Sequence, residues 1–219
     1  MIGQVVTIDQ FLAALWDTLY MVLASLGIGS VLGIILGVAL VVTREGGVLA
    51  NRWVYRVLSP VINVLRSIPF IILMVAILPL TRFLTGTTVG TTAAIVPLVA
   101  FAAPYIARLV ENSLLEVPRG IVEAALSMGA TSWQVIWRFL IPEARSSLIL
   151  SVTTAMIGLI GSTAMAGTIG AGGLGDLAIT YGYQRFDTAT MVVTVIVLVI
   201  LVQGIQSLGD VLARRFRRR

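Results

Sequence analysis

The chain has 219 residues, of which 58% are apolar and only 11% are charged, and its mean hydropathy is +1.02. Soluble globular domains carry about 25% charged residues, so this composition excludes an ordinary soluble domain and indicates a membrane protein. The absence of Cys and His excludes disulfides, thiolate metal sites and the commonest proton shuttle. The formal net charge is +5 and every basic residue is Arg, so the Lys of an ATP-binding P-loop is missing.

The uncharged runs of the sequence predict the membrane spans. About 20 apolar residues are enough to cross a bilayer, and runs of this length lie between the charged residues at several places. One further candidate is interrupted by Arg66. We therefore expect a single all-α transmembrane domain over residues 1–219, with five spans at about 18–43, 58–80, 87–107, 146–167 and 188–209.

The first span lacks the features of a removable signal peptide. Residues 1–17 carry no basic segment, and no A-x-A cleavage pattern follows the first apolar run, so we expect the span to remain in the mature protein. Within it, Gly29, Gly33 and Gly37 recur at four-residue spacing and share one helix face. Small residues in this arrangement let another helix approach closely, so this face is predicted to pack against a neighbouring span.

Prolines and one arginine distinguish the second and third spans. Pro69 and Pro79 in the second span, and Pro97 and Pro104 in the third, predict kinks or irregular starts, because proline removes a helical hydrogen bond. Pro79 is expected to mark the outer end of the second span. Two hypotheses stay open for Arg66: its guanidinium reaches the interface or pairs with a neighbouring helix, or it belongs to the transport pathway.

The connection between the third and fourth spans, about residues 111–143, is amphipathic and too polar to cross a membrane. Its first half predicts a short helix that opens near Pro118 and ends at Gly129, since glycine accepts the left-handed conformation of a helix end. The apolar face of this helix is expected at Ile121, Ala124, Ala125 and Met128.

A second short helix is predicted to follow in the same connection. Thr131 and Gln134 have the spacing of a capping box, and Pro142 is expected to close the helix. A helix, glycine turn and helix is more regular than a connector needs, which indicates a docking surface; a hairpin that only links the two spans is the alternative. The predicted apolar face consists of Trp133, Ile136, Trp137 and Leu140.

A glycine-rich stretch follows the fourth span. Gly170, Gly172 and Gly175 spell G-x-G-x-x-G, but a dinucleotide fingerprint needs a strand before it and a helix after it in a βαβ unit, whereas membrane spans flank this one. We therefore expect residues 168–188 to form a loop that bends back into the bundle and lines its outer mouth.

The outer half of the fourth span consists mainly of small residues. Gly161 and Ser162 are among them, and Met165 is the one large side chain. These three residues are candidates for the pathway, because small side chains leave room for a solute. Met165 is the candidate gate, since a flexible thioether can plug the gap, with ordinary helix packing as the alternative.

The distribution of arginines predicts the orientation. Arg44, Arg52 and Arg56 follow the first span, and further arginines surround the connection between the third and fourth spans and end the chain. Positive residues are retained in the cytoplasm, so the N-terminus is expected outside and the C-terminus inside. The terminal RRFRRR, residues 214–219, is expected to sit on anionic headgroups rather than on nucleic acid.

The segment EAALSMGATSWQVIWRFLIP, residues 123–142, resembles the EAA motif of the permeases of bacterial ABC importers. Further segments resemble the methionine-importer branch of these permeases: RSIPFIIL, AAIVPL, APYIARLVENSLLEVP and GAGGLG lie in a likeness that runs from about residue 58 to residue 210. The positions that match the motif are Glu123, Ala124, Ala125, Gly129, Ile141 and Pro142.

This resemblance implies a five-helix permease of the type I ABC importer kind, in the cytoplasmic membrane of a bacterium. The residues of the motif would then belong to the element that docks on a separate ATP-hydrolysing subunit, so the chain itself is no enzyme and needs no cofactor or metal. The implied partners are two ATPase subunits, a second copy of the permease, an extracytoplasmic methionine-binding protein and the lipid bilayer, without nucleic acid. The implied activity is import of methionine by alternating access, with D-methionine, a methionine derivative or another small amino acid left open.

Two other classes of function are disfavoured by the sequence. An ion-coupled carrier usually has ionisable groups near the membrane midplane, whereas Asp17, Asp187 and Asp210 lie at the ends of predicted spans. An odd number of spans also does not divide into two internal repeats. A membrane-bound oxidoreductase would need the glycine stretch to hold its cofactor, which the flanking spans disfavour.

Overall fold

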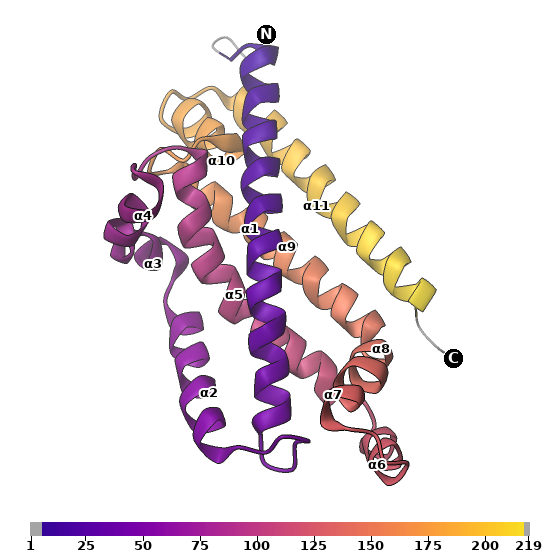
Figure 1. Ribbon diagram of the computed structural model, residues 1–219. Helices are drawn as coiled ribbons and strands as arrows, with labels where there is room; N and C mark the ends of the chain where they lie inside the picture. Colours follow the sequence, from indigo (N-terminus) through magenta and orange to yellow (C-terminus); the bar gives the residue numbers. More distant parts are fainter. Residues whose placement is uncertain (1–5, 217–219) are drawn as a thin grey trace.

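A computed structural model describes residues 6–216, and all the regular structure in this range is helical (Figure 1). The predicted all-α transmembrane class is therefore confirmed. The elements are α1 (Ile8–Thr43), α2 (Arg52–Ser67), α3 (Phe70–Ala76), α4 (Leu78–Thr85), α5 (Thr91–Leu115), α6 (Arg119–Ser127), α7 (Ser132–Gln134), the π-helix η1 (Val135–Leu140), α8 (Ile141–Glu143), α9 (Arg145–Gly167), α10 (Gly173–Leu177), the π-helix η2 (Ala178–Tyr183) and α11 (Thr188–Phe216).

Four helices of the described range are long and apolar enough to cross a membrane: α1, α5, α9 and α11. The first of them starts at Ile8, well before the predicted residue 18, because a capping box opens it. The Thr7 hydroxyl accepts a hydrogen bond from the Gln10 N–H at 3.3 Å, and the Gln10 side chain accepts from the Thr7 N–H at 3.1 Å. Such a cap satisfies backbone donors that the first turn leaves unpaired. The charged residue Asp17 therefore lies inside the helix rather than before it.

The predicted second span is a broken pair of helices. Together α2 and α3 are apolar enough to cross a membrane, but their axes differ by 104°. The break falls at Ile68, whose extended conformation (φ −79°, ψ 123°) is the one favoured before a proline. Pro69 thus produces the predicted kink, whereas Pro79 lies beyond the end of α3, in the first turn of α4.

The centre of the bundle is the contact between α1 and α5, which lie against each other in Figure 1. A Cβ atom added to Gly33 would lie 2.6 Å from the Ile106 Cβ, and one added to Gly29 would lie 3.0 Å from the Ala102 Cβ. The predicted packing role of the small-residue face, which includes Gly37, is therefore confirmed. The helix α5 continues through both of its prolines without interruption.

The glycine stretch folds back into the bundle, as predicted. The N–H of Leu174 donates to the Thr18 hydroxyl of α1 at 2.8 Å, and the N–H of Gly90 donates to the Gly170 carbonyl at 3.0 Å. A Cβ on Gly175 would lie 2.3 Å from the Ala164 Cα, so only glycine allows this approach to α9. The expectation of a loop was wrong in part, because residues 173–183 form α10 and η2.

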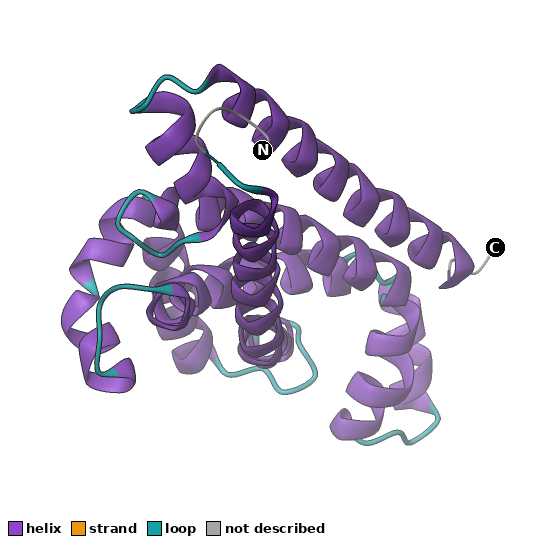
Figure 2. Ribbon diagram, turned by 90° about the horizontal axis from the view of Figure 1, so that it is seen from above, coloured by secondary structure: helices purple, strands orange, loops and turns teal. Residues whose placement is uncertain are grey.

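The last long helix, α11, runs along the outside of the bundle to the C-terminal end, which is clear in the view of Figure 2. Its buried residues are few: Thr190, Thr194, Gly209 and Ala213. It contacts α9 and η2 and leaves most of its apolar surface uncovered. The predicted contact of the basic tail with headgroups involves residues 217–219, which lie outside the described residues.

Candidate functional site

The helix α6 ends in a Schellman motif at the glycine that the sequence singled out. The N–H of Ala130 donates to the Ala125 carbonyl at 3.0 Å, and the N–H of Gly129 donates to the Leu126 carbonyl at 2.9 Å. Gly129 has φ +82°, a conformation that favours glycine. The predicted end of this helix is therefore confirmed.

The burial of α6 differs from the predicted apolar face. Ala125 is fully buried and Ile121 is partly buried, so this side of the helix packs against the bundle. Ala124 and Met128 were expected beside them but are exposed, Met128 at 73%. The prediction of one shared face was wrong at these two positions, because the buried face turns through Val122 and Ala125 instead.

A continuous helical segment, α7, η1 and α8, follows the glycine turn. The predicted capping box is present, since the Gln134 N–H donates to the Thr131 hydroxyl at 3.3 Å and the Gln134 side chain accepts from the Thr131 N–H at 2.9 Å. Within η1, the N–H of Ile141 donates to the Ile136 carbonyl, five residues earlier, which widens the turn before Pro142. Pro142 lies inside α8, and a single residue, Ala144, separates this helix from α9.

The predicted apolar face of the second helix divides into two. Ile136 and Leu140 are buried, as expected. Trp133 and Trp137 are exposed, at 68% and 51%, and their ring centroids lie 5.4 Å apart. The expectation that all four residues pack together was therefore wrong, because the two indoles contact each other on the outside. Of the motif residues, Ile141 is partly buried and packs against the core.

The α6–α8 segment is joined to the end of the bundle by a hydrogen bond. The Ser132 hydroxyl donates to the Val48 carbonyl, in the loop after α1, at 3.1 Å. A cavity of about 590 Å³ lies between this loop, the end of α5 and α6, and both Arg119 and Glu123 line it. The hydrogen bond of Ser132 thus joins the start of α7 to the loop that follows α1.

A polar network ties α2 to α5. Arg108 forms an ion pair with Glu111, whose side chain is 4% exposed. The same guanidinium donates to the Asn63 side-chain oxygen at 2.7 Å and to the Ser59 hydroxyl at 3.1 Å. Arg108 and Glu111 lie beyond the predicted end of the third span at about residue 107, although their (i, i+3) spacing of opposite charges is a signal of continued helix.

The helix α9 leaves one face open. Thr154, Gly161 and Met165 share this face and are exposed, and Met165 is 50% exposed. Nothing lies within 4 Å of a Cβ added to Gly161, which is therefore free of contacts inside this chain. Ser162 differs from the other pathway candidates, because it is 5% exposed and its hydroxyl donates to the Gly158 carbonyl at 3.1 Å. Arg66, the last candidate, is exposed in the final turn of α2.

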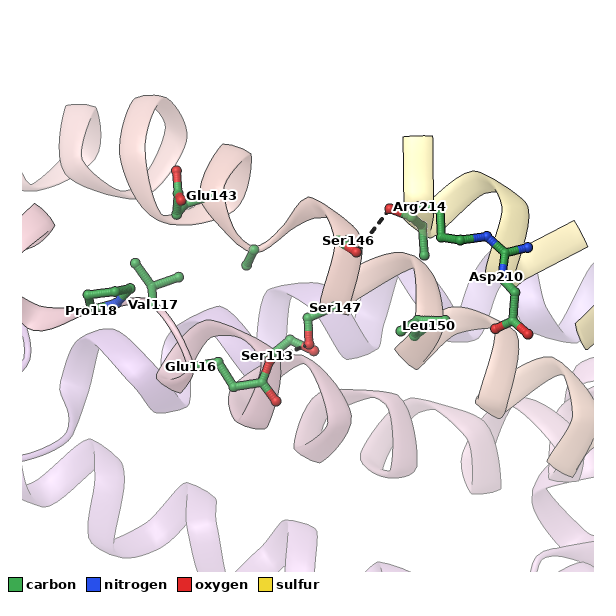
Figure 3. A pocket seen from close by; sticks show the side chains of 12 residues that line it. Ser113, Glu116, Val117, Pro118, Glu143, Ser146, Ser147, Leu150, Asp210 and Arg214 are labelled. Atoms are coloured by element: carbon green, nitrogen blue, oxygen red, sulfur yellow. Dashed lines mark hydrogen bonds between the residues drawn. The ribbon is translucent and has the colours of Figure 1, made fainter. Parts of the chain in front are cut away.

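A polar pocket of about 620 Å³ lies at the α6 end of this open face (Figure 3). It is formed by the end of α5, the start of α9 and the last turns of α11. The Ser147 hydroxyl donates to the Glu116 carboxylate at 2.6 Å, and the Ser146 hydroxyl donates to the Ala213 carbonyl at 3.0 Å. Asp210 and Arg214 of α11 complete the wall shown in Figure 3. Across residues 6–216 no group of three or more His, Cys, Asp or Glu side chains that could hold a metal ion is found.

Known proteins are similar to this chain in sequence and in fold. The family described as "binding-protein-dependent transport system inner membrane component" matches residues 18–219. The chain is 54% identical over 207 residues to the probable D-methionine transport system permease protein MetI of Vibrio cholerae, over 94% of this chain and 92% of that protein. The D-methionine transport system permease protein MetI of Escherichia coli is 49% identical over 152 residues, which cover 69% of this chain and 70% of the relative.

A solved structure extends the likeness to three dimensions. A chain of the inward-facing MetNI methionine ABC transporter superimposes with a TM-score of 0.95 at 45% identity, covering 96% of this chain and 98% of that one. The likeness therefore extends over almost the whole length of both chains. The chain belongs to the family of binding-protein-dependent transport system inner membrane components, as a permease of the methionine ABC transporter type.

Proposed function

We propose that this chain is the membrane subunit of an ATP-driven importer that carries methionine, in its L and D forms, across the cytoplasmic membrane of a bacterium. The solute is supported by the names of the relatives, which are 54% and 49% identical to this chain. The chain contains no Lys and hence no P-loop, so ATP must be hydrolysed by a partner.

The arrangement of α6 carries the proposal. One side of this helix is fixed to the bundle through Ala125, while Glu123, Ala124 and Met128 on the other side are exposed. A helix that is anchored on one side and open on the other suits docking into a groove of an ATPase subunit. Gly129 belongs to this docking element as its turn, whereas Ala125, Ile141 and Pro142 act by holding it in place.

The orientation and the assembly follow from charge and from uncovered surface. With arginines retained in the cytoplasm, α6 and the end of α11 face the cytoplasm, and the start of α1 faces outward. The open faces of α9 and α11 suit a second copy of the chain around a two-fold axis. The pathway then runs along this axis, two ATPase subunits bind the two α6 helices, and an extracytoplasmic binding protein delivers the solute at the α10 end.

Alternating access is the mechanism that fits these parts. Closure of the ATPase pair on ATP moves α6, and α6 moves the ends of α1 and α5 through the contacts around the 590 Å³ cavity. Met165 gates the pathway from the open face of α9, where Gly161 leaves room for the solute. Ser162 supports this helix from its buried side.

Reconstitution tests the function. The permease is purified with its ATPase, placed in liposomes with the binding protein, and assayed for uptake of labelled L- and D-methionine. The proposal predicts uptake that requires ATP and that an unlabelled excess of methionine suppresses. Uptake driven by an ion gradient without ATP would contradict it.

A further inference from the structure

One face of α2 is polar along its whole length. Arg52, Arg56, Ser59, Asn63 and Arg66 recur every three or four residues and therefore lie in one row. In a helix of a membrane bundle, such a row does not face lipid, because charged side chains are costly there and turn toward protein or a water-filled cavity. Ser59 and Asn63 accept hydrogen bonds from Arg108 of α5, so the row faces α5.

Two contacts fix the position of Arg66 relative to α5. Asn63 accepts a hydrogen bond from Arg108, and the ring of Phe70 lies 5.5 Å from the ring of Phe101 in an edge-to-face arrangement. Asn63 therefore meets the later residue of α5, and Phe70 meets the earlier one. The segment from α2 to α3 thus runs antiparallel to α5. Arg66 lies between Asn63 and Phe70, and it is therefore level with the stretch of α5 between Phe101 and Arg108.

This stretch of α5 carries two aromatic side chains, and one of them reaches the open face of α9. Tyr105 stacks on Phe101 with ring centroids 6.0 Å apart, and both rings are partly exposed. A Cβ added to Gly158 of α9 would lie 3.8 Å from the Tyr105 ring, so Tyr105 reaches the edge of the open face that includes Gly161. Tyr105 thus adjoins the open face of α9, at the stretch of α5 with which Arg66 is level.

The backbone of α2 also ends at this level. The helix stops at Ser67, one residue after Arg66, and the chain turns through 104°. Non-helical backbone inside a membrane is tolerated where it lines a cavity, and broken helices hold the solute in many transporters. Arg108 is occupied by Glu111, Ser59 and Asn63, whereas no hydrogen bond or ion pair of the Arg66 side chain is found in residues 6–216.

We propose that Arg66, the Phe101–Tyr105 ring pair and the open face of α9 form a solute station, in which the Arg66 guanidinium binds the carboxylate of a zwitterionic amino acid. Guanidinium groups match carboxylates in a two-pronged geometry. The rings contact the side chain of the solute, and a thioether is attracted to aromatic rings. The identity of the solute in this inference rests on the proposed function. That Arg66 binds a negatively charged group does not depend on it, because it follows from the positive charge of the guanidinium.

The test uses the absence of native cysteine. Gly161→Cys is introduced into the permease–ATPase complex, and its labelling by an anionic and by a cationic methanethiosulfonate reagent is followed on the permease. Arg66→Gln is expected to lower the ratio of the anionic to the cationic rate about fivefold, which is the effect of one unit charge acting in water over roughly 8 Å. Arg66→Lys should preserve the ratio. Arg52→Gln is the matched control on the same row, about 21 Å along the helix, and should leave the ratio unchanged.

Protection by solute gives the second measurement. Millimolar methionine should slow the labelling of Gly161→Cys, and methioninol, which lacks the carboxylate, should not; Arg66→Gln should abolish the difference. An unreactive cysteine, or a ratio that Arg66→Gln leaves unchanged, overturns the station. A ratio that falls as expected while only another amino acid protects supports the station and contradicts methionine as the solute.

Discussion

Replacement of Gly37 by Ala tests the close packing of α1 against α5. An added Cβ would lie 2.6 Å from the Ala107 carbonyl oxygen and 2.7 Å from the Val110 Cβ. The carbonyl is helical backbone and cannot rotate aside, so α1 and α5 must move apart. Overpacking costs about 1–3 kcal/mol, and the better helix propensity of Ala returns about 1 kcal/mol, which leaves a net loss of up to about 2 kcal/mol. For a chain of this size the Tm should fall by up to about 8 °C.

The assay is thermal unfolding of the purified complex in detergent, followed by loss of the monodisperse species on gel filtration. Gly27→Ala is the matched control, since it lies on the same helix with nothing within 4 Å of its added Cβ. It should keep or raise the Tm, because only the propensity gain of up to about 1 kcal/mol applies. If both variants unfold at the same temperature, the close packing of α1 on α5 is refuted.

Three further substitutions test the polar network, the α6 turn and the return of the glycine stretch. Arg108→Gln leaves the buried Glu111 unpaired and should cost about 3–5 kcal/mol, most of which Arg108→Gln with Glu111→Gln should recover in thermal unfolding; an equally unstable double variant would argue against the ion pair. Gly129→Ala places a side chain at φ +82° and should cost about 1–2 kcal/mol and reduce ATP-driven uptake, whereas unchanged uptake would show that the turn geometry is dispensable. Thr18→Val removes the acceptor of the Leu174 N–H and should cost about 1–3 kcal/mol, visible as faster hydrogen exchange at Leu174; unaltered exchange would contradict this contact.

The sequence predicts where the long helices lie but not where they end. Uncharged runs locate α1, α5, α9 and α11, because a bilayer core excludes unpaired charge. The helix α5 nevertheless continues past Arg108 to Leu115, since Glu111 and the polar side chains of α2 neutralise the arginine. Pairing partners that lie far apart in the sequence are invisible to a search for uncharged runs. The Arg108–Glu111 ion pair therefore lies inside α5, beyond the predicted end of the third span at about residue 107.

Helical periodicity predicts the short helices but not the direction of their faces. The glycine stop and the capping box depend on neighbouring residues, so Gly129 and Thr131 were predicted correctly. Whether Ala124 or Ala125 is covered depends on where the bundle lies, and the spacing of apolar residues does not contain that information. Apolar side chains such as Met128 are left exposed, which violates the assumption that apolar residues of a helix face the core. This violation is itself a feature of the candidate docking surface.

The pathway candidates in α9 differ in the side of the helix on which they lie, which the spacing of small residues does not predict. The small residues of α9 predict an open helix surface, and Gly161 and Met165 lie on one. Ser162 points about 100° away from Gly161 around the helix axis and is therefore buried in the bundle. The polar row of α2 was readable in the sequence from the spacing of its arginines. The break at Ile68 that ends this row near Arg66 depends on Pro69, which the sequence also marked.

Site-specific crosslinking of two adjacent alanines measures the central claim, that the exposed side of α6 receives its movement from an ATPase. Ala124 is exposed and Ala125 is fully buried, and the chain has no other cysteine to interfere. With a photoreactive thiol reagent attached in the assembled complex, Ala124→Cys should crosslink to the ATPase subunit, and Ala125→Cys should not. A complex in which Ala124→Cys gives no crosslink to the ATPase, or in which the two variants crosslink equally, would contradict the account.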